Sequence, residues 1–142
     1  MGDRGYNPMN WNCERQGCFN IEKRPKIEEF HDCFHSNISM SDVDAIVEVN
    51  GNILIIEWKQ HNQELGIGQR ILFQRLTCRD RIFVYVVRGC PRTMEIEGYQ
   101  LIEDGNMPTP FVECTTSHFL TILKDFNDWA VKNPRKCNVE KD

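Results

Sequence analysis

Two apolar runs rich in Val and Ile lie within residues 43–59, and they are separated by Asn50 and Gly51. Asn-Gly is the preferred pair for a two-residue type I′ turn, so the pattern predicts a β-hairpin. Such a turn pairs Val49 with Asn52 and thereby sets which side chains face one another along both arms. One face of this hairpin is apolar nearly throughout, and we expect it to pack against a helix.

Helical and strand-like periods follow one another along the rest of the chain. They predict a short helix over 24–34, a helix from about residue 68 to 77, a buried central strand over 81–89, one or two edge strands over 91–105 and a closing helix over 115–133. Thr115 or Thr116 is expected to cap the closing helix, and Pro134 to end it. We therefore expect an α/β fold in which a mixed β-sheet is flanked by α-helices.

The length of 142 residues suits a single domain, with an irregular segment over 1–24 and a core over 25–132. No apolar run approaches the ~20 residues that span a bilayer, and the N-terminus lacks the apolar segment of a secretory signal. We expect a cytoplasmic protein with reduced thiols and no membrane partner.

Two carboxylates face each other at the open end of the predicted hairpin. The register places Asp44 directly opposite Glu57, and Lys59 follows on the same face. Opposed carboxylates repel, and a divalent cation such as Mg²⁺ or Mn²⁺ is the natural compensation. Lys59 would then lie beside a metal-bound water. The alternative is a charged strand end in solvent, where Lys59 neutralises Asp42.

Seven cysteines raise the question of a structural zinc site. Cys13 and Cys18 are close in sequence, and Cys33 follows between His31 and His35. This spacing matches no strong zinc signature. Free cysteines and solvated histidines are the favoured interpretation, so we expect no stoichiometric Zn²⁺ and keep a zinc site as the alternative.

Basic residues are concentrated in one part of a chain whose net charge is −4. Residues 66–92 hold six arginines and a single acid, Asp80. Two interpretations are open: a solvated helix face with charged strand ends, or a local surface that binds phosphate. On the second interpretation, Arg70 and Arg75 of the predicted helix would hold a nucleic-acid backbone.

The hairpin motif, Asp-Val-Asp at 42–44 followed by Glu-Trp-Lys at 57–59, resembles the PD-(D/E)XK nucleases, most of all the compact phage and repair-type members. The resemblance covers roughly residues 22–90 and implies a restriction-endonuclease-like fold that hydrolyses DNA with Mg²⁺. It implies that Asp44 and Glu57 bind the metal, assisted by the carbonyl of Trp58. It also implies that Lys59 positions or deprotonates the attacking water.

The same resemblance extends to the flanking helices. Gln69 followed by Phe73 is similar to the Gln-x-x-x-Tyr pattern of the exonuclease branch, with Phe in place of Tyr. The early-helix glutamate of the family would be Glu28 or Glu29, of which we favour Glu28.

Two classes of function without catalysis stay open beside the DNA nuclease. One is a nucleic-acid-binding or regulatory module on the same fold, and the other is a phage-encoded protein-interaction module that uses the acidic C-terminal half. The sequence also leaves open exonuclease or endonuclease action, and a monomer or a homodimer.

Overall fold

The computed structural model describes most of the chain: residues 15–17, 22–35, 38 and 40–139, without the side chains of Glu28 and His31. The chain divides into two compact units, Met1–Asp42 and Val43–Asp142, each of which is described by itself. The expectation that both belong to one domain stays a prediction.

The first unit contains a single 3₁₀-helix among its described residues, η1 (Ile27–Cys33). The Glu29 amide donates to the Lys26 carbonyl at 3.0 Å, the i to i−3 bond of a tight helical turn. The helix predicted over 24–34 is therefore present in shorter form and as a 3₁₀-helix. Its short length accounts for this, because few i to i−4 bonds can form there.

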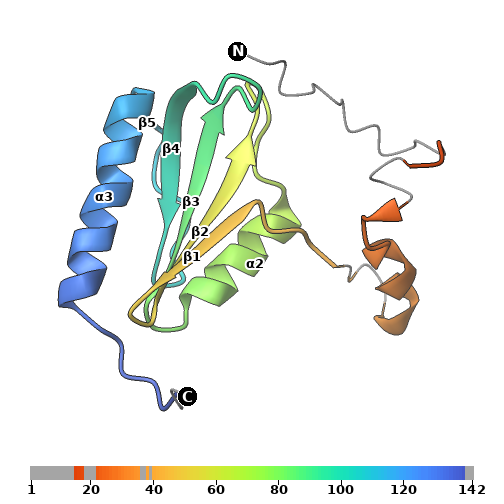
Figure 1. Ribbon diagram of the computed structural model, residues 1–142, viewed down its shortest axis with the longest axis horizontal. Helices are drawn as coiled ribbons and strands as arrows, with labels where there is room; N and C mark the ends of the chain where they lie inside the picture. The colour runs from red at the N-terminus through yellow and green to blue at the C-terminus, as the bar shows by residue number, and fades with distance from the viewer. Residues whose placement is uncertain (1–14, 18–21, 36–37, 39, 140–142) are drawn as a thin grey trace. The chain divides into compact units, whose positions relative to one another are not determined.

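The second unit is a five-stranded mixed sheet with one helix on each face (Figure 1). Its elements are β1 (Ala45–Val49), β2 (Asn52–Lys59), α2 (Ile67–Thr77), β3 (Ile82–Gly89), β4 (Ile96–Ile102), β5 (Val112–Glu113) and α3 (Thr116–Lys132). The strands lie in the order β1-β2-β3-β4-β5, and only β2 and β3 pair in parallel, joined by α2. The predicted mixed sheet flanked by helices is confirmed at this level.

The hairpin register is confirmed. Val49 pairs with Asn52, and Ala45 pairs with Ile56 at the other end of β1. Asn50 and Gly51 both adopt positive φ, 51° and 86°, as a type I′ turn requires.

The centre of the sheet is covered on both faces, as predicted for 81–89. On one face Val84 packs with Phe73 of α2, and on the other Val87 packs with Phe119 of α3. Both valines are fully buried. The apolar face of the hairpin lies on the α3 side, where Ile56 belongs to the second cluster.

The expected edge strands differ from the structure. β4 is interior, because the two-residue strand β5 pairs with it at Gly98 and Tyr99. A strand of two residues is too short to show alternation, which is why the pattern did not indicate it. At the start of α3, Thr115 is confirmed as the cap, since its Oγ1 accepts from the His118 amide at 3.1 Å.

Asn52 is the one polar residue that the sequence placed on the apolar face of the hairpin, and it is fully buried. Its Nδ2 donates to the carbonyls of Val49 at 3.1 Å and Asn133 at 3.0 Å, with Ala130 at 3.4 Å. One amide therefore ties the hairpin turn to the end of α3.

Replacing Asn52 should destabilise this unit. Asn52→Leu keeps a side chain branched at Cγ but leaves buried carbonyls without donors, so we expect the free energy of unfolding to fall by roughly 2–3 kcal/mol. Urea denaturation measures this. Asn106→Leu, at an exposed position in the loop after β4, is the control and should change stability by about 0.5 kcal/mol or less. Equal effects would show that the Asn52 amide does not hold the turn.

Candidate active site

Glu57 is a carboxylate buried near the carboxyl end of β2. The residue is only 6% exposed, and it lies on the α2 side of the sheet, two positions after Ile55 of the core. A carboxylate in such a place is costly unless charge and hydrogen bonds compensate it. Its Oε1 lies 3.1 Å from the ammonium Nζ of Lys59.

Gln69, in the first turn of α2, completes this cluster. Its Nε2 donates to Glu57 Oε1 at 2.9 Å, while its Oε1 accepts from Lys59 Nζ at 2.8 Å. One amide thus holds both the carboxylate and the ammonium. Phe73, one helical turn later, is buried in the core and fixes the face of α2 that carries Gln69.

Asp44 lies just before β1 and reaches across to the neighbouring strand. Its Oδ2 accepts from the backbone N–H of Trp58 at 2.7 Å. The Trp58 side chain lies on the other face of the sheet, where its indole N–H donates to the Gly89 carbonyl at 3.0 Å. The suggested role of the Trp58 carbonyl stays a prediction.

The donor set can be tested for its fit to Mg²⁺. Asp44 accepts a hydrogen bond at Oδ2, and Glu57 accepts one at Oε1. Within the described part of the chain, the other oxygen of each carboxylate accepts no hydrogen bond. Mg²⁺ is usually held by one or two carboxylates together with waters, so these residues fit the ion. Among the residues that the structure describes, no group of three or more His, Cys, Asp or Glu side chains is gathered for a metal.

The repulsion that we expected between Asp44 and Glu57 is offset in the structure. Lys59 neutralises Glu57, and the Trp58 amide donates to Asp44. Lys59 therefore has a partner within its own strand. Its side chain is 15% exposed, which differs from the alternative of a solvated strand end.

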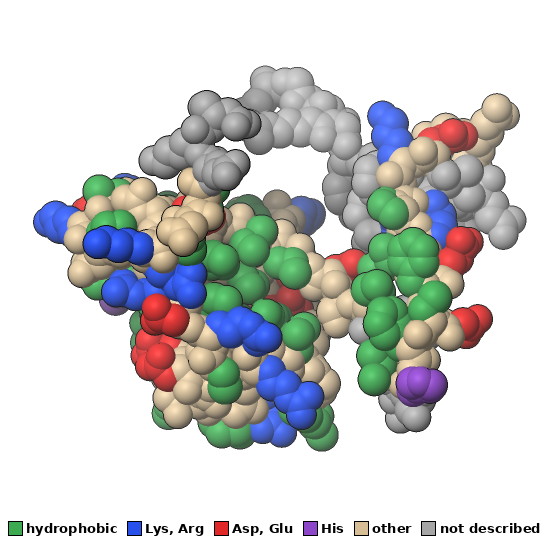
Figure 2. Space-filling view, turned by 90° about the horizontal axis from the view of Figure 1, so that it is seen from below, with side chains coloured by type: hydrophobic (Ala, Val, Ile, Leu, Met, Phe, Trp, Pro, Cys, Tyr) green, Lys and Arg blue, Asp and Glu red, His purple; other side chains and the backbone are tan. Residues whose placement is uncertain are grey.

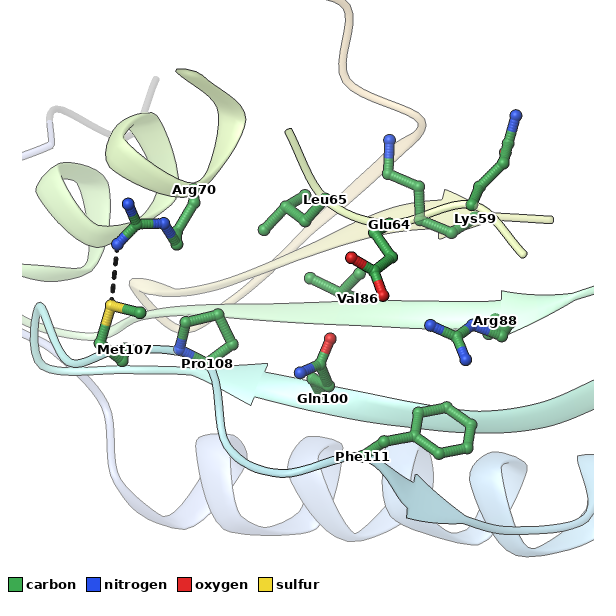
Figure 3. Close-up of a pocket in the computed structure, with 11 residues that line it drawn as sticks. Lys59, Glu64, Leu65, Arg70, Val86, Arg88, Gln100, Met107, Pro108 and Phe111 are labelled. Atoms are coloured by element: carbon green, nitrogen blue, oxygen red, sulfur yellow. Dashed lines mark hydrogen bonds between the residues drawn. The ribbon is translucent and has the colours of Figure 1, made fainter. Parts of the chain in front are cut away.

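A pocket of about 440 Å³ opens beside Lys59 on the α2 side of the sheet (Figure 3). Cationic, acidic, amide and apolar side chains line it together: Lys59, Gln63, Glu64, Leu65, Arg70, Val86, Arg88, Gln100, Met107, Pro108 and Phe111. Arg88 and Phe111 lie at one end, and Arg70 lies beside Met107 at the other.

The segment between β4 and β5 forms one wall of this pocket and is held at several points. Thr109 exchanges two hydrogen bonds of 2.9 Å with the Leu101 backbone: its amide donates to the carbonyl, and its Oγ1 accepts from the N–H. The Gly105 amide donates to Thr77 Oγ1 at 3.1 Å, and the Gly105 carbonyl accepts from Gln74 Nε2 at 3.2 Å. The wall is therefore anchored both to β4 and to α2.

The basic part of the sequence does not form one surface. Arg70 and Arg88 line the pocket, whereas Arg75 is exposed on α2 and does not line it. Arg81 packs over the Trp129 ring at 5.0 Å and donates to Asn52, which is a structural role. On the face seen from below, Lys and Arg side chains lie next to Asp and Glu (Figure 2). DNA binding by Arg75 stays a prediction.

Sequence reasoning missed Arg88, Gln100 and Phe111 as site residues. A signal for Arg88 was present, because it is the charged residue that ends the apolar strand over 81–89. In the structure it pairs with Lys59 across the parallel strands, so both side chains lie on one face. Gln100 and Phe111 gave no comparable signal, since their position depends on how β4 and β5 pair.

Several predicted residues lie outside what the structure describes. Cys13 and Cys18 are in undescribed segments, and the side chain of Glu28 is not described, so the zinc alternative and the role of Glu28 stay predictions. Glu29, like Cys33, is exposed. Within the described residues, the helices are all too short or too polar to cross a membrane.

Comparison of the chain with family models, with curated proteins and with solved structures finds no match. The resemblance to PD-(D/E)XK nucleases therefore rests on the motif residues alone.

Metal binding at the carboxylates can be tested without any activity. We expect Mg²⁺ to raise the melting temperature, because a ligand of the folded state stabilises it, by about 2.7 kcal/mol at a hundred times its dissociation constant. Asp44→Asn keeps an acceptor for the Trp58 N–H but removes the charge, and should weaken the response. Asp125→Asn, exposed on α3, is the matched control. A full Mg²⁺ response in Asp44→Asn would exclude Asp44 as a ligand.

Proposed function

We propose that this chain is a metal-dependent nuclease that hydrolyses DNA phosphodiester bonds. The observation that carries the proposal is the buried cluster of Glu57, Lys59 and Gln69 beside Asp44. A strand end with a merely solvated charge pair would not need a third side chain, from a helix, to hold both charges. The restriction-endonuclease-like form of the α/β fold belongs to the same proposal.

The residues have separate roles in this proposal. Asp44 and Glu57 hold Mg²⁺ through the oxygens that hydrogen bonds leave available. The ion, when bound, supplies Lewis-acid stabilisation and an activated water. Lys59 would position the attacking water and offset negative charge on the scissile phosphate. Gln69 orients the Lys59 ammonium and the Glu57 carboxylate, while Arg70 contacts the DNA backbone.

A second candidate is a nucleic-acid-binding module without catalysis. It is favoured by the absence of a third metal-ligating side chain beside the two carboxylates in the described part of the chain. Both candidates bind DNA, but only the nuclease requires that Lys59 act on the chemical step.

Lys59→Met separates the two candidates. Methionine keeps most of the apolar stem, so packing should survive, while the loss of a positioned ammonium should slow cleavage by about 10²–10⁴-fold. Single-turnover cleavage at saturating Mg²⁺ measures the rate, and DNA affinity in Ca²⁺ measures binding, which should change little. Glu57→Gln should lose the Mg²⁺ response and cleavage together.

Lys124→Met is the matched control, because Lys124 is exposed on α3, on the other face of the sheet. It should cleave at the wild-type rate. If Lys59→Met also cleaves at that rate, Lys59 has no catalytic role and the nuclease proposal loses its main support. If the wild-type protein binds DNA without cleaving it, the second candidate is correct.

A further inference from the structure

We infer that the pocket beside Lys59 binds a single unpaired nucleotide, so that DNA enters the site as a single strand or a frayed end. This inference rests on the proposed function, because it names the form of DNA that the same site would accept. It is carried by the charge, the walls and the size of the pocket.

The positive charge at the Arg88 end of the pocket favours the binding of an anion there. Arg88 pairs with Lys59 on the neighbouring strand, and like charges side by side are unfavourable. Lys59 is neutralised by Glu57, whereas Arg88 has no acidic partner within the described residues. Its Nε is buried and has no hydrogen-bond partner in that part of the chain. Because Arg88 also lines the pocket, an anion such as phosphate that enters there meets a guanidinium charge that no described acid neutralises.

The other end of the pocket has a second guanidinium, which likewise has no carboxylate partner among the residues that the structure describes. Arg70 donates from Nη1 to Gln74 Oε1 at 3.3 Å and to the Met107 sulfur at 2.9 Å, both neutral acceptors. Figure 3 shows Arg70 and Arg88 at opposite ends, with Glu64 and Gln100 between them. If one nucleotide occupies the pocket, Arg70 and Arg88 are thus available to bind the phosphates on its two sides.

The walls of the pocket require more than a simple anion. Met107, Pro108 and Phe111 give it an apolar side, and the Arg88 guanidinium lies over the Phe111 ring at 4.7 Å. Bases stack on aromatic rings and on guanidinium planes, whereas free phosphate gains nothing from such a wall. Glu64, near the middle, disfavours a phosphate there and can accept from the amino group of a base.

The size of the pocket sets the number of nucleotides. A volume of about 440 Å³ lies at the lower part of the range for small-molecule sites, which suits one nucleotide. A base inside such a pocket cannot also be paired and stacked in a duplex, so binding must unpair it first. Single strands and frayed ends avoid that cost.

Binding to the full chain in EDTA tests this inference independently of cleavage. The probes are a short single-stranded DNA, the blunt duplex of the same sequence, and deoxycytidine 5′-monophosphate as a competitor. We expect the single strand to bind about tenfold more tightly than the duplex. The monophosphate should compete better than deoxycytidine or inorganic phosphate alone.

Variants locate the binding. Arg88→Met and Phe111→Ala should each weaken single-strand binding by about tenfold, the effect of losing one charge-assisted hydrogen bond or one stacked base. Arg70→Met tests the opposite end, in case Arg88→Met does not fold. Arg79→Met, exposed beyond the end of α2, makes the same charge change away from the pocket and should bind as wild type.

The outcomes separate this inference from the proposed nuclease. Equal affinity for duplex and single strand, or unchanged binding in Phe111→Ala and both pocket-arginine variants, overturns the nucleotide pocket even if the protein cleaves DNA. Pocket-dependent single-strand binding that persists in Glu57→Gln supports the pocket, and does so even if the protein never cleaves.

Discussion

The register of the β1–β2 hairpin is the constraint on which the candidate site depends. Two positive φ angles at Asn50 and Gly51 fix a two-residue turn, and every pair of residues along the arms follows from it. A slip of one position in this pairing would place Asp44 and Glu57 on opposite faces of the sheet. The buried Asn52 amide, tied to the end of α3, opposes such a slip at the turn itself.

Helix α2 joins the apolar core to the polar site. Phe73 packs in the core, and Gln69, one turn earlier, bridges Glu57 and Lys59. One helix can provide both the core residue and the bridging amide because residues four apart lie on the same helix face. Hydrophobic packing therefore positions the site as much as its own hydrogen bonds do. A change that loosens the packing of α2 would also disturb the geometry of the Glu57, Lys59 and Gln69 cluster.

Local patterns were enough to predict the hairpin, its register, α2, β3 and α3, because each depends on neighbours in sequence. The prediction that Asp44 lies opposite Glu57 came from the same local information, and the structure shows Asp44 accepting from the Trp58 amide just beyond the paired residues. What could not be predicted depends on distant contacts. The pairing of Lys59 with Arg88 arises from the parallel alignment of β2 with β3, and the place of Phe111 depends on a strand of two residues. The predicted helix over 24–34 is shorter in the structure, where η1 spans Ile27–Cys33 as a 3₁₀-helix.

The anchored segment between β4 and β5 has a consequence for how this protein can change. In the function that we propose, Asp44 before β1 and Glu57 and Lys59 of β2 supply the chemistry, whereas Met107, Pro108 and Phe111 of that segment shape the pocket. Because Thr109 and Gly105 secure the segment at separate points, the side chains between them can be exchanged without moving the carboxylates. On the proposed function, reactivity and selectivity are thus encoded in different stretches of sequence, and each is free to diverge while the other is kept.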